Sequence, residues 1–507
     1  MPRLPPALWL CLHLPELPLD ALGPWPSQLA LPALVWARER GGQRVHTANA
    51  AACALGVQPG QRLASAQAVA PTALVLARDT GREAEHLQRL ALALGAFTPR
   101  LAIAAPDLLL DIRASLRLFG GVRPLLRRAR ALAAAQGPVR VGLAATPLAA
   151  RLFARQGLHG QRSLHLASTR RRLHALPLIA LPGVCTLPAP AGEMLQALGT
   201  RTLADLARLP RPGLHRRGAG PWLQALDQAS GQQPDLPAWF TPPEHFAVRL
   251  ELGWRAETAP AIDAAAAPLV QALCGWLERR WQAAQALRLV LKHEHGARRS
   301  LPDEVLQLEL ATPTRDATHL QRLLSERLQR LPLAAPVDAL MLQLDAAVPD
   351  AGRPTSLLPD DPHAAQADEA TLIDRLRARL GPERIQRLVL QDDARPEQAG
   401  RAETAQPGAT PLPGTAPALP RPGWLLCQPQ PLPERDGLPC KGNEPLRLLT
   451  PAERIETGWH DGALVRRDYH VALAADGALL WVYLERGHHR TGSSTEPPSW
   501  FLHGLFG

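Results

Sequence analysis

The order of extended and helical segments between residues 246 and 344 constrains the fold of this chain more than any other feature. Apolar residues recur at every second position in a strand and about every 3.6 residues in a helix, so the two kinds of segment differ in pattern. The segments are, in order, a strand, a helix, two strands, a helix and a strand, at Phe246–Leu252, Ala264–Trp281, Leu287–Leu291, Val305–Leu310, Leu320–Leu331 and Ala339–Leu344. The order β-α-β-β-α-β is that of a split βαβ unit. We therefore predict a four-stranded sheet backed by two helices over residues 245–346.

The first 170 residues also alternate between strand-like and helix-like patterns. Leu8–Leu14 is a continuous apolar run typical of a buried strand, and two short strands flank the turn Ala105-Pro106-Asp107. The other segments are one strand at Val139–Leu143 and helices at Thr47–Leu55, Gln61–Val69, Arg82–Leu94, Pro124–Ala135 and Pro147–Arg155. This pattern predicts a layered α/β fold with an antiparallel element.

The rest of the chain divides by composition. Residues 171–240 hold short helical patterns interrupted by Pro and Gly, which indicates a small helical domain. Residues 347–393 contain a polar, turn-rich stretch and then a helix, and residues 394–423 are crowded with Pro, Ala, Gly and Thr, which predicts a disordered linker. Residues 424–507 carry paired strand patterns and predict a compact β-rich module. The fold class we expect is thus α/β and multidomain.

The charge of the chain favours a polyanionic partner. It has 56 basic and 46 acidic residues, a net charge of +10, and all but Lys292 and Lys441 of the basic residues are arginines. Such a surplus of positive charge favours binding to nucleic acid. An Ala/Leu/Arg-rich composition also follows from coding bias, and this second reading stays open.

Neither a membrane span nor a metal site is expected. We found no run of about 18 apolar residues without polar interruption, and the N-terminus reaches Pro15 and Glu16 without a signal-peptide cleavage site. The cysteines are scattered, with no C-x-x-C pair and no zinc-ligand spacing. We therefore expect a cytoplasmic protein with no membrane partner, no metal and no disulfide framework.

Three stretches carry a resemblance to a known family. The stretch from Thr47 to Leu63 resembles the fingers segment of the Y-family translesion DNA polymerases, Val141–Ala144 resembles a strand of their palm, and Leu110–Ile112 resembles the strand of their second acidic motif. The resemblance covers roughly residues 6–346. It implies a palm over 1–170 with small fingers at about 24–75, a helical thumb over 171–240 and a little finger over 245–346.

Most of the acids that such a polymerase needs are missing. Its chemistry uses two divalent cations held by about three carboxylates. At the matching positions stand Leu12 and Leu14 in the first strand and Pro106 in the second motif, and only Asp107 remains. The resemblance therefore implies a degenerate catalytic site without metal or other cofactor.

Two further acids, Glu16 and Asp20, follow the first strand beyond Pro15. The chain should be leaving the strand there, so we expect neither carboxylate to point at the same spot as Asp107. An active polymerase that uses Asp107, Asp111 and a displaced acid nevertheless stays open as the alternative function.

The positions that would bind the nucleotide have also lost the residues of the family. The family's fingers carry a Tyr and an Arg that contact the triphosphate, and the matching residues here are Ala50 and Cys53. A bidentate phosphate donor has thus become a small thiol. Arg155 is a possible substitute ligand at the end of its helix. The resemblance implies no nucleotide site at Ala50 and Cys53.

The C-terminal region carries a resemblance to one particular family of proteins similar to these polymerases. The phrases Arg454–Trp459, Arg467–Tyr469 and Trp500–Phe506, together with the altered first strand, resemble the ImuB family. Members of that family are similar to Y-family polymerases without the catalytic acids and serve in a bacterial, damage-induced (SOS) mutagenesis complex. The resemblance implies a noncatalytic scaffold whose partners are primer-template DNA, the sliding clamp, an error-prone replicative-type polymerase and a RecA-like accessory protein. It also implies a cytoplasmic, nucleoid-associated protein.

Candidate DNA contacts lie in the predicted thumb and little finger. The turn at Gly183, Val184 and Cys185 resembles a helix-hairpin-helix, whose backbone N–H groups bind a phosphate, although its second glycine is Cys185. The alternative is an ordinary helix connection. Four arginines are further candidates for phosphate contacts, unless they are simply solvated: Arg216, Arg217, Arg298 and Arg299.

Two segments are candidates for protein contacts. The stretch Pro354-Thr355-Ser356-Leu357-Leu358 lies where the ImuB resemblance places a clamp-binding peptide, although Gln and the aromatic residue of the pattern are replaced; the alternative is an ordinary loop. At the C-terminus, Trp500, Phe501, Leu505 and Phe506 either dock a partner or fold back as core, and we predict partner binding. We expect Trp459 and Tyr469 to build the core of the same module. A plain DNA-binding protein without protein partners would leave this region without a role.

Overall fold

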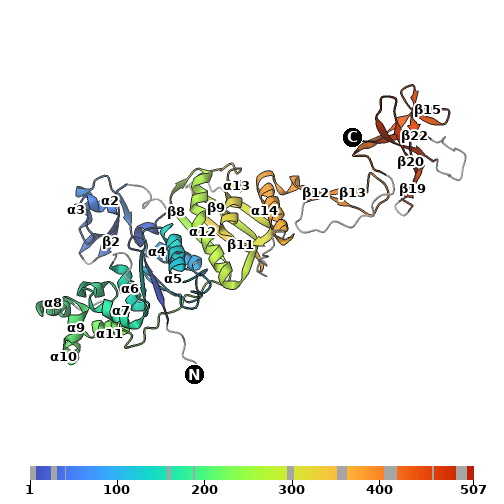
Figure 1. Cartoon of the computed structure of the whole chain (residues 1–507). Coiled ribbons are helices and arrows are strands. Elements are labelled where there is room, and N and C mark those ends of the chain that lie inside the picture. Colours follow the sequence, from blue (N-terminus) through green and yellow to red (C-terminus); the bar gives the residue numbers. More distant parts are fainter. Residues whose placement is uncertain are drawn as a thin grey trace. The chain divides into compact units, whose positions relative to one another are not determined.

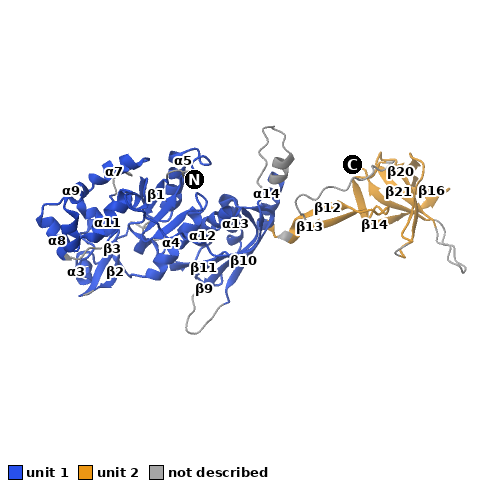
Figure 2. Cartoon of the chain, turned by 90° about the horizontal axis from the view of Figure 1, so that it is seen from below, with its two compact units in different colours: residues 1–379 blue, residues 380–507 orange. Residues whose placement is uncertain are grey.

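The computed structural model describes residues 7–506 apart from 24–30, 40, 157–161, 186–188, 294–301, 351–361, 405–419, 460–461 and 487–498. The chain forms two compact units, residues 1–379 and 380–507, which have different colours in Figure 2. Arg298, Arg299 and the predicted clamp-binding residues 354–358 lie outside the described residues.

Unit 1 begins with an antiparallel sheet, the N-terminal sheet, whose strand order is β5-β6-β1-β7 (Figure 1). Its strands are β1 (Trp9–His13), β5 (Leu101–Ala104), β6 (Asp107–Asp111) and β7 (Arg140–Ala144). The helices beside it are α1 (Leu17–Asp20), α4 (Thr80–Leu94), α5 (Val122–Ala134) and α6 (Pro147–Arg155). The central strand β1 is buried at all five residues, as its continuous apolar run predicts.

A second, small sheet has the order β3-β2-β4 and lies in the region predicted as fingers. Its elements are β2 (Ala33–Glu39), β3 (Gly42–Ala48), α2 (Ala50–Ala54), α3 (Leu63–Val69) and β4 (Leu74–Ala77). The predicted helix over 47–55 is too long, because Thr47 and Ala48 pair with β2. Helix α2 begins only after Asn49, whose Oδ1 accepts a hydrogen bond from the Ala52 amide at 2.9 Å.

Short helices follow, in the region predicted as thumb. They are α7 (Leu166–His174), the 3₁₀ helix η1 (Leu178–Gly183), α8 (Ala189–Ala197), α9 (Leu203–Arg208), α10 (Arg211–Arg216) and α11 (Gly220–Ala229). Their apolar residues share one cluster with α6 and with one face of the N-terminal sheet. The helical segment is therefore anchored to that face.

The predicted β-α-β-β-α-β order is present in the following region. Its elements are β8 (Ala247–Ala256), α12 (Ala259–Arg280), β9 (Gln282–His293), β10 (Glu304–Thr314), α13 (Ala317–Leu328) and β11 (Val337–Pro349). They form a four-stranded antiparallel sheet of order β10-β9-β11-β8. Helix α14 (Pro362–Leu380) ends the unit, and Asp374 in it accepts a hydrogen bond from the Ala311 amide of β10.

Helix α12 is long and apolar enough to cross a membrane by length and composition, and within the described residues it alone meets that test. It packs, however, against α4, α13 and three strands of its own sheet, and 56% of its most apolar window is buried. Its apolar surface is thus covered by protein, which is the arrangement of a core helix.

Unit 2 starts with a two-stranded hairpin that corrects one prediction. Strand β12 (Gln386–Leu390) pairs with β13 (Gly400–Thr404), so the linker predicted over 394–423 contains a strand at its start. Backbone hydrogen bonds from β12 outweigh the local composition, which favours disorder. Residues 405–419, the larger part of that linker, lie outside the described residues.

The rest of unit 2 is a β-rich module, as predicted. A sheet of order β14-β22-β21-β20-β18, with β19 on β20, is accompanied by three very short strands. The sheet strands are β14 (Trp424–Leu432), β18 (Arg447–Leu448), β19 (Glu453–Thr457), β20 (Val465–Leu473), β21 (Leu479–Glu485) and β22 (Ser499–Leu505). The short strands are β15 (Glu434–Arg435), β16 (Leu438–Lys441) and β17 (Glu444–Pro445).

The aromatic tail belongs largely to the core of this module, which is one of the two alternatives that the sequence left open, and partner binding by its exposed part stays a prediction. Strand β22 lies between β14 and β21, Trp500 is 5% exposed, and Phe501 stacks on Tyr483 with ring centroids 5.2 Å apart. Phe506 packs against the same cluster, and Leu505 is 37% exposed.

The two aromatic residues expected in the core of this module behave differently. Tyr469 is fully buried, as predicted, whereas the prediction for Trp459 is wrong, because its side chain is 80% exposed. A strand pattern predicts burial better for Tyr469, inside β20, than for Trp459, which lies beyond the end of β19.

Candidate functional site

Strand β1 divides its side chains between the two faces of the N-terminal sheet. Trp9 and Cys11 pack in the apolar cluster of α6, whereas Leu12 and Leu14 pack in a separate cluster with α4 and α5. Successive side chains of a strand point to opposite faces, so His13 lies on the α6 face with Cys11.

Asp107 is the residue that faces His13 from the neighbouring strand β6. Its side chain is completely buried, and its Oδ1 accepts a hydrogen bond from His13 Nδ1 at 2.7 Å. Its Oδ2 accepts from Arg151 Nε at 2.9 Å and from Arg155 Nε and Nη2 at 3.2 and 2.9 Å. Both carboxylate oxygens are therefore engaged with protein donors.

This geometry corrects the predicted positions of the missing acids. Leu12 and Leu14 lie on the opposite face of the sheet from Asp107, so acids at these two positions would point toward α4 and α5. The residue of the first strand that meets Asp107 is His13. Pro106 lies in the turn just before β6, and its carbonyl oxygen accepts a hydrogen bond from the Leu14 amide at 3.1 Å.

The charges around Asp107 compensate for its burial. Burial alone would raise the pKa of this carboxyl, but the hydrogen bond from His13 and the positive charges of Arg155 and Arg151 hold the pKa below its ordinary value. The pKa of the neighbouring Cys11 thiol is instead raised well above its ordinary value. Burial is the main cause, and the negative charge of Asp107 adds to it. The site thus holds a carboxylate and a protonated thiol.

Helix α6 positions the two arginines because Gly142 lets it approach the sheet. Arg151 and Arg155 are one helical turn apart, at i and i+4, and therefore share a face of α6. A Cβ at Gly142 of β7 would lie 2.1 Å from the Ala150 carbonyl oxygen and 2.5 Å from the Ala154 nitrogen. Only glycine permits this approach, which brings both guanidinium groups to Asp107.

The other nearby acids do not join Asp107. Asp111 is four residues further along β6, about 13 Å away at the rise of a strand, and pairs with Arg100 at 3.4 Å. Asp20 lines a cavity beside α4 and α5, on the opposite face. Glu16 precedes α1, and burial raises its pKa while Arg140 opposes this. Among the residues that the structure describes, no three His, Cys, Asp or Glu side chains form a metal-binding group.

Comparison with known proteins supports the resemblance. Residues 27–155 match the model of the impB/mucB/samB family. The chain is 27% identical over 478 residues to Protein ImuB from two Caulobacter vibrioides strains, NA1000/CB15N and ATCC 19089, and the match covers 89% of this chain and 100% of each relative. The chain is therefore similar to ImuB over nearly its whole length.

Solved structures also match the chain, at low TM-scores. The insertion ternary complex of Dbh DNA polymerase is 17% identical with a TM-score of 0.39, and DinB from Sulfolobus solfataricus is 16% identical with a TM-score of 0.38. Each match covers 67% of this chain and 98% of the other. These scores are too low for a residue-by-residue comparison.

The positions predicted for a lost nucleotide site in this chain lie together on α2. Ala50 and Cys53 are both exposed, and the Cys53 thiol points to the Ala48 carbonyl at 3.7 Å. Neither side chain carries a charge that binds phosphate. Arg155, the possible substitute, is engaged with Asp107.

The turn after η1 does not have the free amides of a phosphate-binding hairpin. The amides of Val184 and Cys185 both donate to the Leu181 carbonyl at 2.9 Å. The Cys185 carbonyl accepts from Trp222 Nε1 at 3.4 Å, and Gly183 is exposed. The amides of Val184 and Cys185 already have partners inside the helical segment, which favours the alternative of an ordinary helix connection, and phosphate binding at this turn stays a prediction.

Two of the predicted arginines fit a contact with phosphate. Arg216 ends α10 and Arg217 caps it, and both side chains are exposed. Arg216 donates to the Pro212 carbonyl, and Arg217 lies 3.6 Å from the Met194 sulfur. Among the described residues, no carboxylate pairs with either guanidinium, which leaves their charges available to an anion.

Sequence reasoning missed His13 and Arg151 as members of the Asp107 cluster. The helical spacing of Arg151 and Arg155 directly after the Val141-Gly142 strand was a usable signal for Arg151. His13 had no comparable signal, because its role depends on the register between β1 and β6.

Proposed function

We propose that this chain is a noncatalytic, Y-family-like scaffold for translesion synthesis and damage-induced mutagenesis. The observation that carries the proposal is the state of Asp107, whose two oxygens accept hydrogen bonds from His13, Arg151 and Arg155. The similarity to Protein ImuB supports the biological context. Palm, fingers, thumb and little finger are names that the proposal gives to the predicted regions.

The chemical argument concerns the two cations of a polymerase. Divalent metals of this kind are bound by several oxygens, and paired metals repel each other unless carboxylates surround them. Here one carboxylate is present, and two guanidinium groups occupy one of its oxygens while His13 occupies the other. The positive charge that metals would bring is thus already supplied by Arg151 and Arg155.

A primer-extension assay separates the scaffold from the alternative, an active polymerase with unusual ligands. The full-length chain is tested at high concentration with Mg²⁺ or Mn²⁺, beside an Asp107→Ala variant and a Y-family polymerase as positive control. We expect no incorporation by either form of this chain. Incorporation by the wild type that is absent from Asp107→Ala, with circular dichroism showing that the variant is folded, would establish the enzyme and overturn the scaffold.

Sequence-independent DNA binding is part of the proposal, and the net charge of +10 and the exposed pair Arg216 and Arg217 support it. Binding to primer-template DNA should weaken steeply with salt, with a log–log slope near −0.9 per neutralised phosphate. The double substitution of both arginines by Ala should reduce this slope by about 2. An unchanged slope would remove these two residues from the interface.

Protein partners complete the proposal. We place sliding-clamp binding at residues 354–358, and contacts with an error-prone replicative-type polymerase and a RecA-like accessory protein in unit 2. Leu357→Ala with Leu358→Ala should abolish capture of the clamp, whereas Thr355→Ala should retain it. Retention by the double variant would exclude this peptide. Recruitment of the other partners by the full chain, but not by a chain ending at residue 379, would support the role of unit 2.

A further inference from the structure

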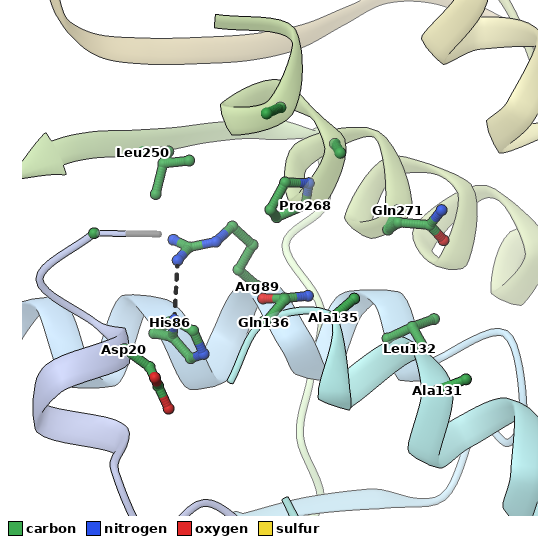
Figure 3. A pocket seen from close by; sticks show the side chains of 13 residues that line it. Asp20, His86, Arg89, Ala131, Leu132, Ala135, Gln136, Leu250, Pro268 and Gln271 are labelled. Carbon is green, nitrogen blue, oxygen red and sulfur yellow. Dashed lines mark hydrogen bonds between the residues drawn. The ribbon is translucent and has the colours of Figure 1, made fainter. Parts of the chain in front are cut away.

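A cavity of about 470 Å³ lies between the N-terminal sheet's helices and α12. Figure 3 shows His86 and Arg89 of α4 at one side, Leu132 and Ala135 at the end of α5, and Pro268 and Gln271 of α12 across from them. The cavity is on the opposite face of the N-terminal sheet from Asp107.

Small side chains and a close helix crossing explain why this space exists. A Cβ at Gly275 would lie 2.2 Å from the Leu92 carbonyl oxygen, so α12 touches the backbone of α4 at that point. Further along, the facing positions of α12 and α5 are small and cannot fill the space between the helices. They are Ala264, Ala267, Ala131 and Ala135. The result is an apolar wall beside a polar end.

The polar end contains a buried cation without an acidic partner among the described residues. Arg89 is 5% exposed, and its Nη2 lies 3.3 Å from His86 Nδ1, while its Nε has no partner in the described part of the chain. Burial lowers the pKa of Arg89 to about 10, against the opposing effect of Glu85. A buried guanidinium with so few hydrogen bonds is costly, and an anion would offset that cost.

The second orphan group is His86, which is 3% exposed. A guanidinium can only donate, so His86 Nδ1 must accept from Arg89. Burial lowers the pKa of His86 to about 3, so the ring is neutral and its Nε2 carries the remaining hydrogen. That Nε2 has no partner among the described residues, and neither has the buried oxygen of Gln136. Two N–H donors beside a positive charge are the groups that bind a carboxylate.

We infer that this cavity binds a small organic acid, with its carboxylate at Arg89 and His86 and its apolar body along the alanines and Pro268. Asp20 also lines the cavity, and in Figure 3 it lies on the other side of His86 from the Arg89 guanidinium. Because residues of α4, α5 and α12 line the cavity, the bound acid would contact all three helices and stabilise their packing.

Calorimetric titration of the full-length chain with phenylpropionate tests the inference, with phenylpropionamide as the neutral match. The acid should bind saturably, and the amide at least about tenfold more weakly, because it lacks the charge that Arg89 recognises. Arg89→Leu should bind the acid more weakly than the wild type, by a similar factor. Since that substitution also removes an uncompensated buried charge, the melting temperature of the unliganded variant should stay unchanged or rise.

Two further variants keep the test decisive. Arg130→Leu changes an exposed arginine of α5 that does not line the cavity, and it should bind the acid as the wild type does. Ala267→Phe fills the cavity from α12 and should abolish binding of acid and amide alike, even if Arg89→Leu fails to fold. Absence of saturable binding to the wild type, or equal binding by Ala267→Phe, would overturn the inference.

Discussion

Arg155 donates from Nε and Nη2 to a single oxygen of Asp107, at 3.2 and 2.9 Å. The contact joins the last residue of α6 to the first residue of β6, which are 48 residues apart in the chain. Arg151, one turn earlier in α6, donates to the same oxygen. Ion pairs between distant parts of the chain therefore hold the carboxylate that a metal would need.

Replacing Asp107 by Asn should destabilise the protein strongly. The substitution leaves Arg151 and Arg155 largely buried beside a neutral amide, and breaking a buried ion pair in this way costs about 3–5 kcal/mol. The free energy of unfolding in urea measures the effect. Asp111→Asn is the matched control on the same strand, where the partner Arg100 is 63% exposed, and it should cost about 1 kcal/mol. Equal losses in both variants would contradict the structural role of the Asp107 cluster.

Gly142→Ala should separate α6 from the sheet. The new methyl group would meet the backbone of Ala150 and Ala154 rather than a flexible side chain, so we expect a loss of about 3 kcal/mol. Gly192→Ala provides the control, because Gly192 lies inside α8 with no atom within 4 Å of its added Cβ. That variant should gain up to about 1 kcal/mol from helix propensity. Thermal unfolding of both variants checks the difference in sign.

His86 should make the protein sensitive to acid. Its pKa is lowered to about 3 in the folded chain, whereas the unfolded chain binds a proton near pH 6.5, so the unfolded state binds more protons between these values. The stability that neutral His86 provides is complete above about pH 6.5 and is lost as the pH falls toward 3, by up to about 1.4 kcal/mol per pH unit.

Urea unfolding at pH 7 and pH 5 tests this dependence in the wild type and in His86→Phe. The variant should lose less stability than the wild type between the two pH values, because it lacks the group that the unfolded chain protonates. His245→Phe makes the same change at an exposed position and should follow the wild type. A variant at position 86 with the same pH dependence as the wild type would refute the assignment.

Trp500 and Trp459 should differ in their effect on unit 2. Trp500→Ala removes a buried core side chain and should cost about 3–5 kcal/mol. Trp459→Ala should change the stability by about 0.5 kcal/mol or less, since the side chain is 80% exposed. Unfolding of the full chain, followed by near-ultraviolet circular dichroism, compares them. A large loss for Trp459→Ala would place that residue in the core after all.

Local patterns are sufficient for much of the secondary structure. The β-α-β-β-α-β order is visible because strands and helices repeat their apolar residues with different periods, and β1 is a central strand because its apolar run has no polar face. The helix predicted over 47–55 begins too early because Thr47 and Ala48 pair with β2, and a local pattern does not reveal that partner.

The amino-acid sequence by itself determined that few acids are available to a metal in the first 170 residues, since residue types are read directly. Tertiary structure decided which of the remaining groups meet. The face of each β1 side chain and the register with β6 bring His13, not Leu12, to Asp107, and Gly142 brings Arg151 and Arg155 to the same oxygen. A shift of one residue in the strand pairing would reverse these faces, and such long-range register has no signature in a local stretch of chain.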